Sequence, residues 1–272
     1  MAEEYEVCDN LQEEVDEQVA EEEKEPEEVD IAQALAETME KENGDSHTEY
    51  DPNVFHPSGL APCLRQSFIR KLGIDYHDTQ TLGVFKIGTL VHEYIENEVC
   101  EQLPDSFQHE TEVEYETENG IKITGHADGY DPENEVVYDF KTTGKNGWGG
   151  DDRYPNDFDG HKKDYINQLH VYMKALGAKK AKIVYVHKLD MQVRTYPEKE
   201  GEFIEFDEQR WEYIKQKAEK VREAVKEVVT EKEDGYELQL QELADGLPFE
   251  KCSRDDCYQC KRYETLVEEL QG

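Results

Sequence analysis

Two short stretches, Gly125-His126-Ala127-Asp128 and Asp139-Phe140-Lys141, are separated by ten residues and decide how this chain folds. Both belong to strand-like runs, and the turn residues Asp131–Asn134 between them predict an antiparallel pair. In such a pair Asp128 and Asp139 lie side by side, and Lys141 points to the same face as Asp139. Two carboxylates and an ammonium on one face predict a divalent-cation site, because Mg²⁺ and Mn²⁺ prefer oxygen ligands. An Asp-x-Lys triplet alone would also suit a surface salt bridge.

The flanking sequence predicts a mixed α/β domain with one central sheet flanked by helices. The expected helices are 58–73, 83–102, 161–176 and 207–232. The expected strands are 111–117, 121–128, 135–141, 181–187 and 192–196, and the glycine-rich residues 144–160 are expected to form a loop.

Four further residues come in the order along the chain that such a site would need. His92 lies on the helix before the strands and could add an imidazole ligand to the same cation, with Glu96 one turn further on the same face. Gln168 and Tyr172 are spaced i and i+4 on a later helix, so they share one face. Each could be an ordinary structural residue, but together they form an ordered set.

Charge divides the chain into two parts. Residues 1–50 contain 20 acidic residues against two lysines, a local charge of −18 in a chain of −36. We expect residues 1–50 to form an acidic disordered tail, within which 31–39 could form an amphipathic helix on a partner. Residues 51–272 form the expected domain. The net charge excludes a generally basic nucleic-acid coat, so any DNA contact needs a local positive patch.

Local basic segments could supply that patch. Residues 160–199 contain nine Lys or Arg and three acids, including Lys162 and Lys163, and residues 58–74 add Arg65 without any acid. No apolar run is long enough to span a membrane, and the first residues do not resemble a signal peptide. We therefore expect a cytoplasmic protein without membrane partners.

The cysteines suggest a metal or cluster site rather than disulfides. Cys252, Cys257 and Cys260 lie close together in the cysteine-rich segment 246–263, and Cys63 is the candidate for a remote fourth ligand. Four thiolates could hold a 4Fe–4S cluster or Zn²⁺.

The motif series resembles that of RecB-family PD-(D/E)XK nucleases. The matching residues are Gly88-x3-His92, Gly125-x2-Asp128, Asp139-x-Lys141 and Gln168-x3-Tyr172, and Ser58-x4-Cys63-x-Arg65 is similar to the entry motif of the iron–sulfur members. Those members include the AddB nuclease domain, the helicase-nuclease of Okazaki-fragment processing and the CRISPR-associated Cas-four exonucleases. Their usual C-terminal spacing is C-x2-C-x5-C, whereas here the longer gap comes first.

The resemblance implies a restriction-endonuclease-like core and metal-dependent cleavage of DNA. It implies His92, Asp128 and Asp139 on Mg²⁺ or Mn²⁺, Lys141 at the attacking water, and Gln168 and Tyr172 near DNA. It favours a 4Fe–4S cluster over zinc. The expected activity is exonucleolytic, on single-stranded DNA or DNA ends, with a helicase or integrase as a possible partner. The alternative is a non-catalytic iron–sulfur or zinc module that binds DNA ends or serves as a CRISPR-integration partner.

Overall fold

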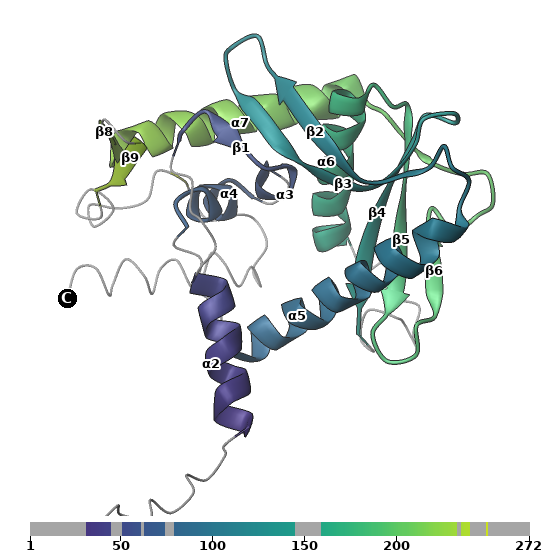
Figure 1. Ribbon diagram of the computed structural model, residues 1–272. Helices are drawn as coiled ribbons and strands as arrows, with labels where there is room; N and C mark the ends of the chain where they lie inside the picture. Colours follow the sequence, from purple (N-terminus) through teal and green to yellow (C-terminus); the bar gives the residue numbers. More distant parts are fainter. Residues whose placement is uncertain are drawn as a thin grey trace, which may run out of the picture.

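The computed structural model describes residues 31–44, 51–60, 63–73, 79–144, 159–232, 235–239 and 249. Within these ranges the chain forms a mixed α/β fold around one central sheet, with helices on both faces (Figure 1). This confirms the expected fold class, a mixed sheet flanked by helices as in the restriction-endonuclease-like core. No helix in the described ranges is long and apolar enough to cross a membrane.

The central sheet has the order β1-β3-β4-β5-β6, with β2 paired to β3 and β7 paired to β5. The strands are β1 (Val54–Phe55), β2 (Gln108–Glu116), β3 (Lys122–Asp131), β4 (Val136–Thr143), β5 (Lys180–His187), β6 (Val193–Tyr196) and β7 (Ile204–Glu205). β3 and β4 are antiparallel, whereas β4 and β5 are parallel. Parallel neighbours need a crossover connection, and α6 (Asp159–Leu176) provides it.

Two helices cover opposite faces of the middle strands. On β4, Val137 packs into a core cluster with the α6 residues Leu169 and Met173, and the next inward residue on that side is Asp139. Phe140 points the other way and packs with Val91 of α5 (Thr79–Tyr94). The chain continues from α5 into a π-helical turn, Ile95–Val99, and a 3₁₀ turn, Cys100–Gln102.

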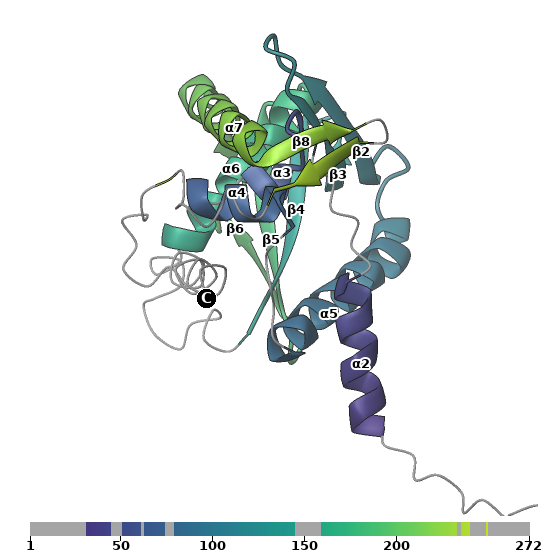
Figure 2. The same cartoon turned by 90° about the vertical axis from the view of Figure 1, so that its left-hand side faces the viewer.

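A second core lies under α7 (Glu208–Val228), whose buried face includes Trp211, Ile214 and Val221. This face packs on α3 (Pro57–Leu60), α4 (Leu64–Lys71) and the β1–β3 end of the sheet. Figure 2 shows α7 crossing one end of the fold and α5 lying at the other. β3 contributes Ile123 to the core under α7 and Ala127 to the cluster under α6, whereas β4 lies between the α6 cluster and the α5 cluster.

Several elements differ from the sequence expectations. The single helix expected at 58–73 is two helices, α3 and α4, on either side of residues 61–63. The helix expected at 207–232 ends at Val228, and Val229–Lys232 forms strand β8 paired with β9 (Gly235–Leu238), because the β-branched run 228–230 favours extended structure.

Part of the expected disordered tail is helical. Residues Ile31–Gly44 form α2, which packs on α5. At this contact a Cβ atom added to Gly83 of α5 would lie 3.8 Å from the Met39 sulfur. Residues 1–30 and 45–50, and nearly all of the loop expected at 144–160, lie outside the described residues.

Candidate active site

The site begins where β3 and β4 stop pairing. Their ladder runs from Asp131↔Val136 to Gly129↔Tyr138, and the next pair in that register would be Asp128 and Asp139. Instead, the Phe140 backbone N–H donates to Asp128 Oδ2 at 2.5 Å. The Asp128 carboxylate therefore accepts the hydrogen bond of a backbone N–H on β4, and the two strands separate beside it. This confirms that the two aspartates are neighbours on adjacent strands.

Asp139 and Lys141 form a buried ion pair on the α6 side of β4. The Lys141 ammonium donates to Asp139 Oδ1 at 2.6 Å, and Asp139 has no exposed surface. Burial raises the pKa of Asp139 to about 7, and the Asp128 charge adds to this effect while Lys141 opposes it. Burial alone would lower the pKa of Lys141, but the two carboxylates outweigh it and the net change is upward.

His92 reaches the same place from α5. Its Nδ1 lies 3.9 Å from Asp128 Oδ1, and its ring meets Phe140 edge to face with centroids 6.2 Å apart. Helix α5 approaches strand β4 closely at Gly88, where an added Cβ atom would lie 3.4 Å from Thr142 Oγ1. This close approach lets the His92 ring reach Asp128. The structure therefore brings together His92, Asp128, Asp139 and Lys141 from three elements.

Gln168 and Tyr172 share one face of α6, as the spacing predicts, but that face is buried. The Gln168 amide nitrogen donates to the Tyr172 hydroxyl at 2.9 Å, and the side chains are 8% and 4% exposed. Burial raises the pKa of Tyr172, and the charge of Asp139 contributes to the rise. The pair lies beside the carboxylates, and its contact with DNA stays a prediction.

Glu110 is a site residue that the sequence analysis did not identify. The register of β2 on β3 places it opposite Asp128, between the pairs His109↔Gly129 and Thr111↔Ala127, and its φ of 45° is left-handed. Burial raises the pKa of its carboxyl, followed by the charges of Glu96 and Asp128, and a side-chain hydrogen bond with Glu96 adds to this effect. Glu96 and Glu110 thus extend the acidic cluster. In sequence, Glu110 is one of many alternating glutamates of a strand.

The predicted DNA-contact residues are only partly described. Lys163 is exposed near the start of α6, whereas the side chain of Lys162 lies outside the described residues. Arg65 has a structural contact, because its Nε donates to the Phe249 carbonyl at 2.7 Å. Cys63 is half-buried at the N-terminus of α4, and Cys252, Cys257 and Cys260 lie outside the described residues.

The residues present fit a divalent cation by their chemistry. Asp139 Oδ2 is buried and has no hydrogen-bond partner among the described residues, a costly arrangement unless something binds it. Asp128 and His92 supply the further oxygen and nitrogen donors. As they stand, no three His, Cys, Asp or Glu side chains in the described part of the chain converge into a formed metal site. Lys141 holds the other oxygen of Asp139.

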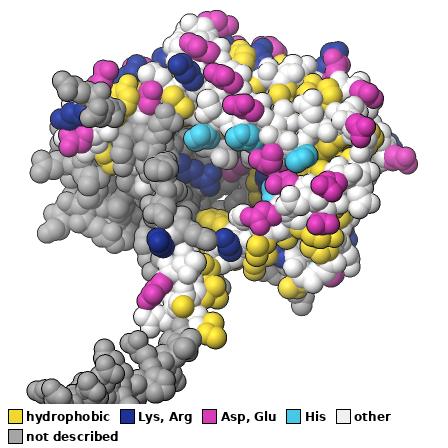
Figure 3. All heavy atoms as spheres, viewed as in Figure 1, with side chains coloured by type: hydrophobic (Ala, Val, Ile, Leu, Met, Phe, Trp, Pro, Cys, Tyr) yellow, Lys and Arg dark blue, Asp and Glu magenta, His cyan; other side chains and the backbone are white. Residues whose placement is uncertain are grey.

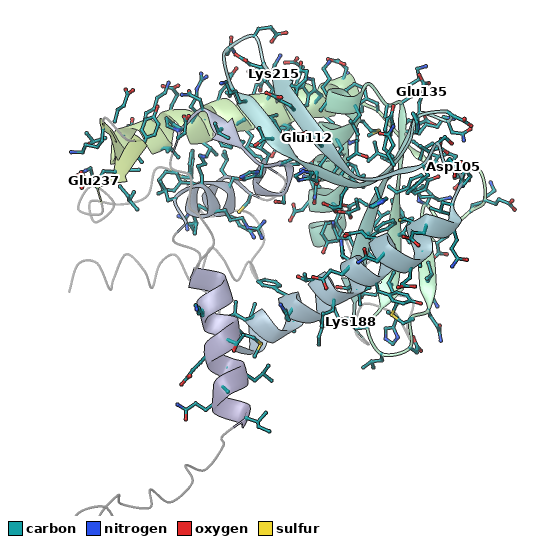
Figure 4. The ribbon with its side chains drawn as sticks, viewed as in Figure 1. Asp105, Glu112, Glu135, Lys188, Lys215 and Glu237 are labelled. Atoms are coloured by element: carbon teal, nitrogen blue, oxygen red, sulfur yellow. The ribbon has the colours of Figure 1, made fainter. Side chains whose placement is uncertain are left out.

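The surface around these residues is open on one side. Figure 3 shows histidine and acidic side chains gathered on the face formed by β2, β3 and α5, next to a hollow in which Lys or Arg side chains are visible. Figure 4 shows Glu112 on β2 above this face and Lys188 beside α5, where the Lys188 ammonium donates to the Val84 carbonyl at 2.8 Å.

Comparison with solved structures finds similar folds at low sequence identity. The protein SSO0001 is 20% identical with a TM-score of 0.47, covering 71% of this chain and 86% of that one. An alkaline exonuclease from Laribacter hongkongensis is 14% identical with a TM-score of 0.43, covering 65% and 89%. A phage-related exonuclease from Haemophilus somnus is 16% identical with a TM-score of 0.41, covering 67% and 95%. No curated protein matches the sequence significantly.

A family model provides the assignment. The model of the PD-(D/E)XK nuclease superfamily matches residues 1–264, which is nearly the whole chain. Asp139 and Lys141 have the two-residue spacing that the name (D/E)XK describes, and Asp128 lies beside them on the neighbouring strand; their role as the site of that superfamily stays a prediction. The chain belongs to the PD-(D/E)XK nuclease superfamily.

Proposed function

We propose that this protein is a metal-dependent DNA exonuclease that hydrolyses phosphodiester bonds in single-stranded DNA or at DNA ends. One observation carries the proposal: Asp139 is fully buried, with one oxygen on the Lys141 ammonium and the other without a partner among the described residues. A purely structural ion pair gains nothing from a second carboxylate, Asp128, placed beside it. The exonuclease and DNA parts of the proposal rest on the motif series.

Each residue has a role that follows from its position. Asp128, Asp139 and His92 would hold Mg²⁺ or Mn²⁺, which when bound supplies a Lewis acid and lowers the pKa of a bound water. The Phe140 N–H fixes one oxygen of Asp128 and leaves Oδ1 directed toward His92. The Lys141 ammonium orients the attacking water and stabilises negative charge that develops on the phosphate oxygens.

The burial of this pair keeps its charges effective. A buried ammonium interacts more strongly with a phosphate oxygen than an exposed one, because less water screens it. The raised pKa of Lys141 keeps it cationic at neutral pH. The Gln168–Tyr172 pair lies behind the carboxylates and would define the wall of the site on the α6 side. Lys163 is exposed on the same helix, and its proposed role is to contact the phosphate backbone.

An assay on end-labelled single strands tests the proposal. With Mn²⁺ or Mg²⁺ the wild-type protein should release nucleotides from the labelled DNA, and Asp139→Asn and Lys141→Met should each remove this activity. Asp105→Asn and Lys215→Met change exposed or peripheral residues of the same types and should leave activity intact. Equal activity in wild type and both site variants would refute catalysis at this site. DNA binding by the wild type without metal-dependent degradation would favour the binding-module alternative.

The mode of attack needs its own substrates. Strands blocked at the 5′ or the 3′ end report polarity, and circular single strands report endonucleolytic cleavage. We expect linear strands with one free end to be degraded and circles to persist. Degradation of circles at the same rate would replace the exonuclease proposal with an endonuclease.

A 4Fe–4S cluster on Cys63, Cys252, Cys257 and Cys260 is also part of the proposal. Support comes from Phe249, which lies three residues before Cys252 in the sequence. Phe249 contacts α4, and Cys63 directly precedes that helix. The Arg65 Nε donates to the Phe249 carbonyl, and the Phe249 ring meets Phe68 with centroids 5.8 Å apart. Three residues span about 10 Å at most, so Cys252 can reach the neighbourhood of Cys63. Iron and sulfide analysis of protein purified without oxygen tests this, with loss of iron in Cys63→Ser as the expected result. Bound zinc would favour the alternative metal.

A further inference from the structure

The Lys141 ammonium is enclosed on three sides. Its nitrogen lies 2.6 Å from Asp139 Oδ1 and 3.4 Å from the Phe140 carbonyl oxygen. On the side toward α6 it lies 5.2 Å from the centroid of the Tyr165 ring. The Lys141 side chain as a whole keeps 18% of its surface exposed.

The Tyr165 ring is itself held in place by β5. It packs against Tyr185 with centroids 6.5 Å apart and planes inclined by 59°. Tyr185 is the register partner of Lys141 across the parallel β4–β5 pair. Lys141 and Tyr185 are therefore neighbours on adjacent strands of the sheet, and the Tyr165 ring from α6 lies against both of them.

A flexible lysine needs such a support. The four-carbon stem can swing toward other acceptors, and Asp128, whose charge acts on Lys141, is a near competitor. An aromatic face attracts an ammonium but accepts no hydrogen bond along a fixed axis, so it restrains the nitrogen without taking the protons that Asp139 and a substrate need. Tyr165 lies one turn before Gln168, outside the four motifs, and none of the sequence patterns selected it.

From this geometry we propose that Tyr165 is a positioning residue that holds the Lys141 ammonium between Asp139 and the scissile phosphate. The proposal rests on the nuclease activity proposed above. The aromatic face makes the contact with the ammonium. Phenylalanine at this position should therefore preserve the function, and an aliphatic residue should not.

The kinetic test compares Tyr165→Phe with Tyr165→Leu, with Tyr213→Leu as a control because Tyr213 is 52% exposed on α7. Loss of the cation–π contact should lower kcat of Tyr165→Leu by about 2- to 30-fold and leave KM unchanged. Tyr165→Phe and Tyr213→Leu should keep kcat within about 2-fold of wild type on the same scale. An equal loss in the Phe variant, or a rise in KM with constant kcat, would overturn the proposal, because the hydroxyl or DNA binding would then be responsible.

A second readout does not depend on activity. In protein labelled with ¹³C-lysine, the ε-methylene signal of Lys141, assigned by its loss in Lys141→Arg, should be shifted upfield by the aromatic ring. The shift should persist in Tyr165→Phe and disappear in Tyr165→Leu. If the shift is absent from the wild type, or persists in the Leu variant, the positioning role is wrong. If the shift behaves as expected but no variant cleaves DNA, Tyr165 holds Lys141 and the proposed nuclease function fails.

Discussion

Replacing Asp139 with asparagine should change how the stability of the metal-free protein depends on pH. Asp139 has no exposed surface, and its pKa rises from the ordinary 3.8 to about 7 in the folded protein. Well below pH 3.8 the carboxyl is protonated in both the folded and the unfolded chain. Between about pH 4 and 7 the unfolded chain has lost this proton while the folded protein retains it, so the free energy of unfolding falls as pH rises.

The difference between the unfolded pKa of 3.8 and the folded pKa of about 7 corresponds to a loss of about 4 kcal/mol in the free energy of unfolding. This loss is complete once the pH is above the folded pKa. The amide side chain in the Asp139→Asn variant does not titrate. The difference in free energy of unfolding between wild type and Asp139→Asn should therefore change by up to about 4 kcal/mol across this window, in favour of the variant at the higher pH. Carboxylates remote from the site act equally on both proteins and cancel in the difference.

Urea unfolding in the presence of a chelator, at half-unit steps from pH 4.5 to 8, measures this difference. Asp105→Asn, an exposed carboxylate in the turn before β2 (Figure 4), serves as the matched control and should give a flat difference. Saturating Mn²⁺ should diminish this loss in the wild type, because the cation binds the deprotonated carboxylate of the folded protein and so lowers its pKa. A flat difference for Asp139→Asn as well would show that Asp139 ionises normally in the fold, and would refute the argument from burial.

Three other substitutions test the packing and burial of the fold. Gly129→Ala should cost about 1–3 kcal/mol in urea unfolding, because its methyl group would begin 2.6 Å from the Phe107 ring; an unchanged midpoint would contradict this close contact. Trp211→Ala should cost about 3–5 kcal/mol, since this side chain is 2% exposed in the core under α7, and a cost below 1 kcal/mol would place it outside the core. Lys217, which donates to the Leu60 carbonyl, has its pKa lowered by burial to about 8, so the wild type should gain stability relative to Lys217→Met between about pH 8 and 10.5. No gain over that interval would show an ordinary lysine pKa.

The sequence predicted the centre of the site better than its surroundings. Asp128, Asp139 and Lys141 could be placed because a short turn and the two-residue period of strands determine which side chains meet. The orientation of Gln168 toward Tyr172 follows from helical spacing, but the burial of both depends on how α6 packs against the sheet. Local spacing carries no such information.

Other features depend on backbone geometry that the sequence does not signal. Glu110 joins the cluster through a positive φ in the middle of a strand, a conformation rare for a residue with a side chain. The end of α7 at Val228 was missed because the charged residues continue the helical pattern into β8. Residues 31–39 were considered as a possible helix within the expected disordered tail, and the helix in the structure is longer, Ile31–Gly44, and packs on α5.

The hydrogen bond between Arg65 and Phe249 joins positions 184 residues apart. During synthesis α4 emerges from the ribosome long before the residue that completes its surroundings, and the α7 face that covers it also comes late. Contacts this distant in sequence slow folding and leave apolar surface exposed in the meantime. The nascent chain would therefore depend on chaperones, or on the strong repulsion between its many negative charges, to avoid aggregation before it is complete.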